Sequence, residues 1–271
     1  MLMSRMNLLQ LDGAELRLGA QHFGPFSIQV KAAERVAILG PSGAGKSTLL
    51  KLMSRECTPY RGQVAFFGRN MQDWRWQELS HHRAVLPQST QMAFGLPVTL
   101  VIGLGRVARQ HDPAHDEVVA LAAAQAHAAH LLARRFDTLS GGEQARVQLA
   151  RVFAQLWDVR DGLILVDEPL AALDPGLQMD LLDSLEAYAC QRRHAVVAIL
   201  HDMNQAMQGF ERLLLIKAGK IVGDLPSGAA AVPALEALFG LELTCLAGPL
   251  GEVLITPRRR LVQRAPGWVA A

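Results

Sequence analysis

The sequence predicts an α/β fold: a mainly parallel β-sheet preceded by antiparallel strands and interrupted by an inserted α-helical subdomain. Short apolar runs without polar alternation, typical of strands buried on both faces of a parallel sheet, occur at residues 36–39, 84–86, 163–166 and 195–200. Each run leads directly into glycine or polar residues. Residues 97–157 contain helical patterns and no strand signal, which predicts the inserted helical subdomain.

The remaining elements follow from weaker signals. The stretch up to Val30 predicts short antiparallel strands, and residues 213–224 predict a hairpin with Gly219 in its turn. Residues 225–271 contain five prolines and predict a loosely organised appendix. We expect residues 1–88 to form the first part of the α/β core, 89–157 the helical subdomain, 158–224 the second part of the core, and 225–271 the appendix.

Composition excludes several classes of protein. Half of the 271 residues are hydrophobic and 19% are charged, which excludes a globally disordered chain. The net charge of +2 argues against a dedicated nucleic-acid surface, so no nucleic-acid partner is expected. The three cysteines form no short pair, which excludes a disulfide framework or a zinc ribbon and fits a reducing compartment.

Neither a targeting segment nor a membrane span is expected. Acidic residues Asp12 and Glu15 precede any long apolar run. Residues 84–105 carry no charge, but Pro87 and Pro97 make them poor material for a lipid-exposed helix. We therefore expect a chain that is soluble by itself and docks on an apolar partner.

The strongest motif is a glycine-rich loop between the first apolar run and a predicted helix start. Its glycines let backbone N–H groups converge on phosphate oxygens, and the helix N-terminus adds a favourable dipole. Lys46 is expected to reach the β- and γ-phosphates, and the Ser47 hydroxyl to bind Mg²⁺. The alternative, a chance glycine turn, does not explain the matching strand and helix on either side. The loop comprises Gly40, Pro41, Ser42, Gly43, Ala44, Gly45, Lys46, Ser47 and Thr48.

An acidic pair ends the third apolar run. Asp167 is suited to hold Mg²⁺ directly or through water, and Glu168 is suited to polarise an attacking water. The alternative is a helix N-cap before Pro169, and only the glycine-rich loop elsewhere in the chain favours the catalytic interpretation.

A second glycine motif begins a predicted helix inside the helical subdomain. Serine and paired glycines at a helix N-terminus form a cradle for an anion. In isolation, an ordinary serine N-cap completed by Glu143 explains the motif as well. The motif follows Leu139 and consists of Ser140, Gly141, Gly142, Glu143 and Gln144.

Together, the motifs of the chain resemble those of the ATP-binding subunit of ABC transporters, a phosphate-loop NTPase with a RecA-like core. The resemblance rests on their order along the chain: residues 40–48, Gln88, 139–144, 167–168, 172–174 and His201. The resemblance covers residues 25–225, and the Leu-Ser-Gly-Gly-Glu-Gln signature is its most specific element. It implies an ATP hydrolase with ATP and Mg²⁺ as ligands. It also implies a head-to-tail homodimer, in which each ATP lies between the phosphate loop of one copy and residues 140–144 of the other.

The resemblance implies roles for three further residues. Gln88 matches the loop residue that senses Mg²⁺ and faces the membrane partner, and Asp174 matches the loop that crosses the dimer interface. His201 matches the switch histidine on the γ-phosphate. Each has a plainer alternative: a turn residue after Pro87, a helix N-cap before a proline, and a capped strand end.

The chain departs from the family pattern at two places. Residues 16–19 contain no aromatic side chain to stack on adenine, which leaves Arg17, His22 or Phe23 as the base contact. Leu170 occupies a position where a small hydroxyl residue is usual, beside the catalytic pair and not in it.

Local segments narrow the resemblance within the family. Residues 83–88 and the uncharged run after them resemble importers of iron chelates, haem and corrinoids, and residues 149–161 are most similar to haem importers. This implies a cargo of haem, or otherwise a ferric siderophore or a corrinoid. It also implies two copies of a transmembrane permease, a periplasmic or surface substrate-binding protein, and a peripheral location at the cytoplasmic face of the bacterial inner membrane.

Other ATPase classes fit less well. Non-transport members of the same superfamily usually carry long coiled coils or two ATPase units, and the chain has room for one unit. A phosphate-loop kinase or GTPase does not explain residues 139–144. The uncharged residues 92–105 are expected to be core or interface, because a soluble protein seldom exposes such a run.

Overall fold

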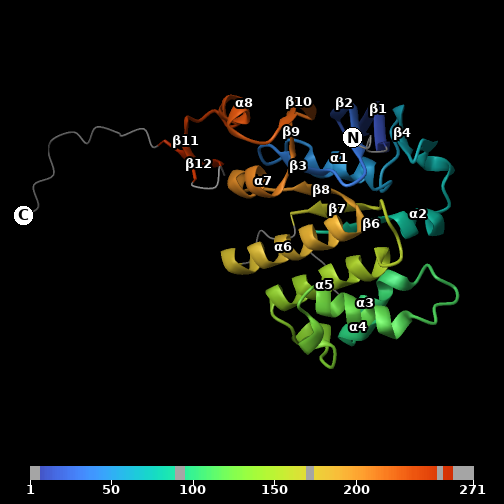
Figure 1. The fold of residues 1–271 in the computed structure, drawn as a ribbon. Helices are drawn as coiled ribbons and strands as arrows, with labels where there is room; N and C mark the ends of the chain where they lie inside the picture. Colours follow the sequence, from blue (N-terminus) through green and yellow to red (C-terminus); the bar gives the residue numbers. More distant parts are fainter. Residues whose placement is uncertain (1–6, 89–94, 169–173, 249–252, 259–271) are drawn as a thin grey trace, which may run out of the picture.

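The computed structural model describes residues 7–88, 95–168, 174–248 and 253–258 (Figure 1). The strands are β1 (Asn7–Leu18), β2 (Gln21–Lys31), β3 (Arg35–Leu39), β4 (Arg61–Phe66), β5 (Arg69–Asn70), β6 (Arg83–Leu86), β7 (Leu163–Asp167), β8 (Ala195–Ile199), β9 (Arg212–Lys217), β10 (Lys220–Pro226), β11 (Leu243–Ala247) and β12 (Val253–Pro257). The α-helices are α1 (Lys46–Met53), α2 (Trp76–His82), α3 (Val98–Gly103), α4 (His115–Gln125), α5 (Gly141–Leu156), α6 (Pro175–Arg192), α7 (Met203–Gly209) and α8 (Val232–Phe239). The 3₁₀ turns are η1 (Met71–Asp73), η2 (Leu104–Arg106), η3 (Ala129–Leu131), η4 (Phe136–Thr138) and η5 (Ala229–Ala231).

A six-stranded sheet in the order β10-β9-β3-β8-β7-β6 forms the centre of the molecule. Its five strands from β9 to β6 are parallel, and β10 pairs antiparallel with β9 at one edge. The four apolar runs are strands β3, β6, β7 and β8, so the predicted parallel sheet is confirmed, as is the predicted hairpin β9–β10. Because β3 lies between β8 and β9, the glycine-rich loop that follows it emerges near the middle of the sheet.

The two faces of this sheet pack into two separate hydrophobic cores. In β3, Val36 and Ile38 face the core shared with α1 and the N-terminal strands. Ala37 and Leu39 face the core shared with α6 and the helical region. All four side chains are buried, which is the physical reason why this strand shows no polar alternation.

Four strands within residues 7–70 form an antiparallel sheet in the order β2-β1-β4-β5. The antiparallel pair β1–β2 was predicted, although both strands are long, with 12 and 11 residues. Strands β4 and β5 and helix α2 were not predicted. They lie before the second apolar run, in a stretch where no long hydrophobic pattern marks them.

Residues 98–156 contain helices and 3₁₀ turns and lie below the main sheet in the view of Figure 1, as the helical pattern predicted. Helix α5 is the axis of this region, and Val147, Ala150 and Ala154 are buried along it. Helix α3 is two-sided: Val98, Val101 and Ile102 are buried, whereas Leu100 is 48% exposed.

The C-terminal appendix is more ordered than its prolines suggested. It contains helix α8 and the hairpin β11–β12, and Leu243 and Ile255 of the hairpin are buried in the main core. Pro233 lies in the first turn of α8 and Pro257 ends β12, so both mark element boundaries. Among the described residues, no helix is both long and apolar enough to cross a membrane.

Candidate functional site

The glycine-rich loop connects β3 to α1 and leaves no room for larger side chains at two of its glycines. A Cβ atom on Gly40 would lie 2.2 Å from the backbone oxygen of Ile216. Gly45 has a φ of 101°, and its Cβ would lie 2.7 Å from Cδ1 of Phe23. Gly45 is also the N-cap of α1 and no side chain caps this helix, so its first backbone N–H groups are available to an anion.

Lys46 lies buried at the start of α1, and its ammonium group is held by the loop itself. Its Nζ donates hydrogen bonds to the backbone oxygens of Gly40 at 2.9 Å and Pro41 at 3.1 Å. Burial lowers the pKa of Lys46, while the nearby carboxylates of Glu168 and Asp167 act in the opposite direction. The loop therefore holds a cation whose partners are carbonyl oxygens, which a phosphate group could replace.

Asp167 ends β7 beside the loop. Ser47 Oγ donates a hydrogen bond to Asp167 Oδ1 at 3.2 Å. Burial raises the pKa of Asp167, and the hydroxyl of Ser47 partly offsets this effect. The hydroxyl and the carboxylate supply adjacent oxygen donors of the kind that Mg²⁺ prefers. Within the described ranges, no group of three or more His, Cys, Asp or Glu side chains could hold a metal alone, so these two oxygens would need phosphate or water to complete a coordination shell.

Glu168 is the point at which the predicted residues converge. Its Oε2 atom lies 2.7 Å from Nε2 of His201 and accepts a hydrogen bond from Nε2 of Gln88 at 3.1 Å. Its Oε1 atom lies 3.9 Å from Nζ of Lys46. The backbone of Glu168 has a φ of 44°, a left-handed conformation that costs energy in a residue with a side chain.

These contacts follow from the topology of the sheet. Lys46, Gln88, Glu168 and His201 come after the carboxyl ends of β3, β6, β7 and β8, four parallel strands of one sheet. Because such ends lie at one edge, residues far apart in the sequence meet there. The structure therefore brings together side chains from the four loops, and their joint function as one site stays a prediction.

A pocket of about 480 Å³ lies over this cluster. Among the described residues that line it, Asp167 and Gln88 are absent. They lie behind the lining and are hydrogen-bonded to two residues of it, Ser47 and Glu168 respectively. The lining residues are Leu18, Gln21, Phe23, Ser42, Gly43, Ala44, Gly45, Lys46, Ser47, Thr48, Glu168 and His201.

One wall of the pocket comes from the turn between β1 and β2, which is far from the acidic pair in the sequence. Leu18, which is 44% exposed, and Gln21 line it, and neither was singled out from the sequence. Phe23 also lines the pocket but is buried against the glycines of the loop. Arg17 and His22, the other expected base contacts, bind each other through Nε and Nε2 at 2.9 Å and are not part of the described pocket lining.

The signature residues and Asp174 lie outside this pocket lining. Ser140 is the N-cap of α5: its Oγ accepts from the backbone N–H of Glu143 at 3.3 Å, and Glu143 Oε2 accepts from the backbone N–H of Ser140 at 2.8 Å. The plainer alternative, a capping box, is thus present, yet Ser140 and Gly141 remain exposed. Asp174 caps α6 by accepting from the backbone N–H of Leu177 at 3.0 Å.

The side chain of Gln144 lies folded against its own subdomain, where Nε2 donates to the backbone oxygens of Phe136 and Leu139. Residues 169–173, which include Leu170 and the two residues before Asp174, lie outside the described residues.

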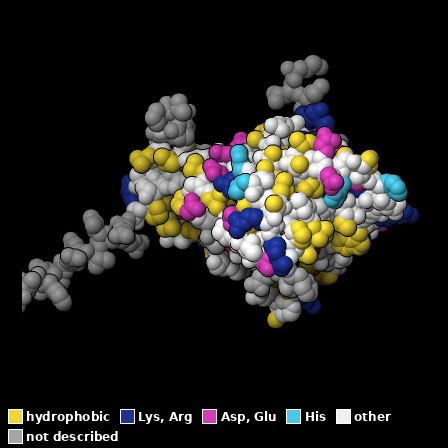
Figure 2. All heavy atoms as spheres, turned by 90° about the horizontal axis from the view of Figure 1, so that it is seen from below, with side chains coloured by type: hydrophobic (Ala, Val, Ile, Leu, Met, Phe, Trp, Pro, Cys, Tyr) yellow, Lys and Arg dark blue, Asp and Glu magenta, His cyan; other side chains and the backbone are white. Residues whose placement is uncertain are grey.

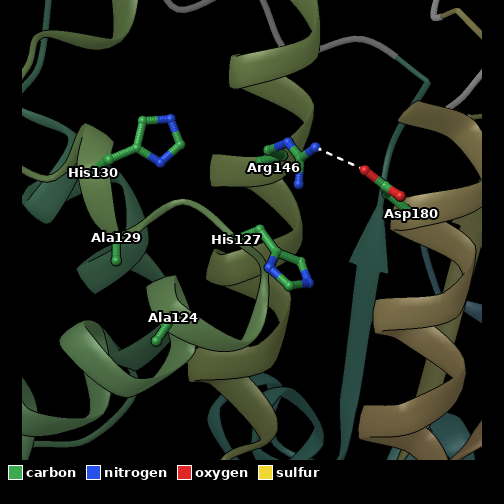
Figure 3. A pocket seen from close by; sticks show the side chains of 6 residues that line it. All are labelled: Ala124, His127, Ala129, His130, Arg146 and Asp180. Carbon is green, nitrogen blue, oxygen red and sulfur yellow. Dashed lines mark hydrogen bonds and ion pairs between the residues drawn. The ribbon is translucent and has the colours of Figure 1, made fainter. Parts of the chain in front are cut away.

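A second pocket, of about 710 Å³, separates the helical region from α6 (Figure 3). Arg146 on α5 and Asp180 on α6 form an ion pair across it, with Nη2 and Oδ2 3.1 Å apart. His127 and His130 line the other side. This ion pair connects the helix that begins with the signature to the helix that begins after Asp174.

Comparisons with known proteins agree with this geometry. A family model described as ABC transporter matches residues 23–171. Two proteins described as hemin import ATP-binding protein, from Pseudomonas entomophila and Pseudomonas putida, are 38% and 39% identical to the chain. Each alignment covers 93% of this chain and 100% of the relative. A protein of the same description from Escherichia coli O157:H7 is 38% identical over 82% of this chain and 88% of its own length.

Solved structures share the fold. A metal-chelate type ABC transporter in an inward-facing conformation superposes with a TM-score of 0.79 at 23% identity, covering 94% of this chain and 98% of that one. A nucleotide-free ATP-binding cassette of an ABC transporter gives a TM-score of 0.73 at 19% identity, covering 91% of this chain and 97% of that one.

Proposed function

The chain belongs to the ABC transporter family, and from that premise we propose that it hydrolyses ATP to power the import of haem through a separate membrane permease. The observation that supports ATP hydrolysis is the meeting of Lys46, Gln88 and His201 at the carboxylate of Glu168, beside a phosphate-binding loop. Phosphoryl transfer requires positioning and charge neutralisation, and this cluster supplies groups for both.

The loop and Lys46 bind the phosphates of ATP. The backbone N–H groups of the loop, to which Pro41 contributes none, would bind the β- and γ-phosphates, and the buried ammonium of Lys46 would exchange its carbonyl partners for phosphate oxygens. Burial strengthens this interaction, because the charge of Lys46 is screened less than a surface charge.

Ser47, Asp167 and Gln88 supply oxygen atoms for Mg²⁺. The ion, when bound with ATP, neutralises negative charge on the phosphates. Asp167 is already oriented by its hydrogen bond from Ser47. Glu168 orients the attacking water and accepts its proton, and His201 donates a hydrogen bond to the γ-phosphate.

Two copies of the chain form a head-to-tail dimer with two composite sites. The exposed N-terminus of α5, with Ser140, Gly141, Gly142, Glu143 and Gln144, contacts the ATP bound by the partner's loop. Asp174 lies at the interface between the copies. Ser140, Gly141 and Asp174 support this arrangement, because they are exposed and lie outside the described pocket lining, where a second copy can reach them. The N-terminus of α5 could bind an anion.

The helical region binds the permease. Figure 2 views the molecule from the side on which this region lies and shows hydrophobic side chains on its surface. Leu100, Leu104 and Val107 are 48%, 40% and 78% exposed, while the opposite side of α3 is buried. Residues 92–105 were expected to be core or interface. Helix α3 has one buried side and one exposed apolar side, and we assign the exposed side to the permease interface. Residues 92–94 lie outside the described residues. Two permease subunits would place the dimer at the cytoplasmic face of the inner membrane.

The cargo proposal rests on kinship. The relatives described as hemin import ATP-binding proteins match over nearly the whole chain, and no pocket described above has to bind the cargo itself. A ferric siderophore and a corrinoid are the other cargoes that the sequence resemblance left open.

Reconstitution in liposomes with the cognate permease and substrate-binding protein tests this function. We expect ATP-driven accumulation of haem and no accumulation with the Glu168→Gln variant. Accumulation of a ferric siderophore or a corrinoid instead would correct the cargo, and failure to associate with any permease would overturn the transport role. A Leu100→Glu variant tests the docking surface: it should hydrolyse ATP alone but lose the stimulation that the permease provides.

We further propose that residues 1–88 and 158–224 act as the nucleotide-binding core, and residues 89–157 as the helical subdomain. The two-core packing of the main sheet supports this division, because one of its faces packs against the helical region and the other against the N-terminal strands.

A further inference from the structure

Helix α7 begins two residues after His201, with Asp202 as its N-cap, and links that segment to the C-terminal hairpin. Asn204 in its first turn pairs with the backbone of Ile255 in β12: Asn204 Nδ2 donates to the Ile255 oxygen at 3.0 Å, and the Ile255 N–H donates to Asn204 Oδ1 at 2.8 Å. The amide thus binds both backbone polar groups of one residue, and Figure 1 shows α7 lying between the hairpin and α6.

The next residue connects α7 in the other direction. Gln205 Nε2 donates a hydrogen bond to Oε1 of Gln178 on α6 at 2.7 Å. Helix α6 begins after Asp174 and carries Asp180, which forms the ion pair with Arg146 described above. The neighbouring side chains of Asn204 and Gln205 therefore connect α7 to the hairpin β11–β12 and to α6, respectively.

The backbone N–H groups of Asn204 and Gln205 bind Asp202, the residue that follows His201. Asp202 Oδ1 accepts from the N–H of Asn204 at 2.7 Å and from the N–H of Gln205 at 3.3 Å. The side chain of His201 is itself 49% exposed and contacts Glu168. Its position therefore depends on the backbone of residues 201–205, which the side chains of Asn204 and Gln205 anchor.

We propose that Asn204 and Gln205 are positioning residues for His201, and that the hairpin β11–β12 serves as the fixed support against which they act. This inference rests on the proposed hydrolysis of ATP. It gives the C-terminal appendix a role in the reaction, although the hairpin contributes no residue to the described pocket lining. Small displacements of a reacting group cost large factors in rate, so loss of either anchor should lower turnover.

The test measures ATP turnover and ATP binding separately in the assembled transporter. Asn204→Ala removes both bonds to Ile255, and Gln205→Leu removes the bond to Gln178. We expect each to lower kcat about tenfold per ATP-binding site, with the Kd for ATP changed less than about twofold because the loop and Lys46 are untouched. Gln208→Ala, an exposed change on the same helix, is the matched control and should leave kcat unchanged.

A conservative variant separates positioning from general destabilisation. Gln205→Glu keeps an acceptor at this position, toward which the Gln178 amide can turn its Nε2, so it should recover most of the turnover lost in Gln205→Leu. Unchanged kcat in both Asn204→Ala and Gln205→Leu would overturn the inference. So would a loss that follows the number of folded, ATP-binding molecules, or an equal loss in Gln208→Ala. If the wild-type transporter hydrolyses no ATP, the proposed function itself fails, and this inference with it.

Discussion

The imidazole Nε2 of His201 lies 2.7 Å from Oε2 of Glu168, and the two residues follow neighbouring parallel strands of the central sheet. Gln88 donates to the same carboxylate oxygen. Both partners contact Oε2, whereas Oε1 has Nζ of Lys46 at 3.9 Å, so this second oxygen can accept a proton from water while Gln88 and His201 stay in place.

The first prediction concerns the carboxylate of Glu168. Glu168→Gln preserves the shape and the contact with Gln88 but removes the proton acceptor, so ATP hydrolysis should fall at least about a hundredfold. ATP binding should persist, and phosphate release and equilibrium binding measure the two properties. Glu117→Gln on the exposed side of α4 is the control. Turnover retained by Glu168→Gln would show that another group is the base.

The second prediction concerns the buried ammonium of the loop. Lys46→Ala removes a charge-assisted contact worth about 1.5–3 kcal/mol, so affinity for ATP should fall about ten- to a hundredfold. Lys51→Ala changes an exposed lysine of the same helix and should have little effect. Equal losses in the two variants, measured by titration with ATP, would mean that general charge attraction and not the loop binds the phosphates.

The third prediction tests whether sites are shared between copies. Ser140→Arg and Lys46→Ala should each abolish hydrolysis alone, because each damages both composite sites of its own dimer. In an equal mixture, half of the dimers are mixed and contain one intact site of two, so about a quarter of all sites should work. Phosphate release by the mixture checks this. A mixture that stays inactive, although the chains exchange, would contradict the head-to-tail arrangement.

The fourth prediction concerns the base of the nucleotide. Leu18 lines the pocket where an aromatic ring would stack, so Leu18→Tyr should strengthen ATP binding by about 0.5–1.5 kcal/mol, or roughly two- to tenfold. Leu121→Tyr, at an equally exposed leucine on α4, is the control. Competition between ATP and GTP measures discrimination, which should be weak in the wild type. A strong ATP preference that Phe23→Ala abolishes would place the base against Phe23 instead.

The fifth prediction concerns stability in acid. His194 is buried, its Nδ1 accepts from the N–H of Gly162 at 2.9 Å, and burial lowers its pKa to about 4. The unfolded chain binds this proton below about pH 6.5, whereas the folded chain does not until about pH 4. The contribution of neutral His194 to the free energy of unfolding is therefore fully present above about pH 6.5. It decreases as the pH falls toward 4, by about 3 kcal/mol in total.

Chemical unfolding between pH 4 and 8 measures this dependence. His194→Asn places an acceptor oxygen near the N–H of Gly162 without a titrating ring. Its stability should therefore change less with pH, whatever its absolute value. An identical pH dependence in the two proteins would assign the acid sensitivity to other groups.

Much of the fold could be predicted because the burial of its central strands leaves a direct pattern of apolar residues in the sequence. Strands β3, β6, β7 and β8 are buried on both faces and therefore consist of apolar runs that stand out in the sequence. Strand β4 has its first three residues exposed and β5 is exposed throughout, so neither presents a pattern that a sequence can reveal. The hairpin β11–β12 was missed because it is stabilised by packing on α7 and the main core, not by a strong pattern of its own.

The site divides in the same way. The loop from Gly40 to Thr48 and the pair Asp167–Glu168 were visible because phosphate and metal chemistry demands particular residue types at fixed spacing. Leu18 lies in the stretch where a base contact was expected, but it was not proposed as one, because an aliphatic side chain carries no such signature and its place in the pocket depends on how β1 turns into β2. Asn204 and Gln205 were missed because their partners, Ile255 and Gln178, become neighbours only in the folded chain.

The strand order of the central sheet also governs when this protein can become functional during its synthesis. Strand β3 carries the loop, but both of its neighbours, β8 and β9, begin only at Ala195 and Arg212. A ribosome adds about 5–20 residues per second, so β3 waits many seconds with both edges unpaired. Unpaired apolar edges invite aggregation. Nascent chains stalled before Ala195 should therefore bind chaperones, and release should follow once β8 and β9 have emerged.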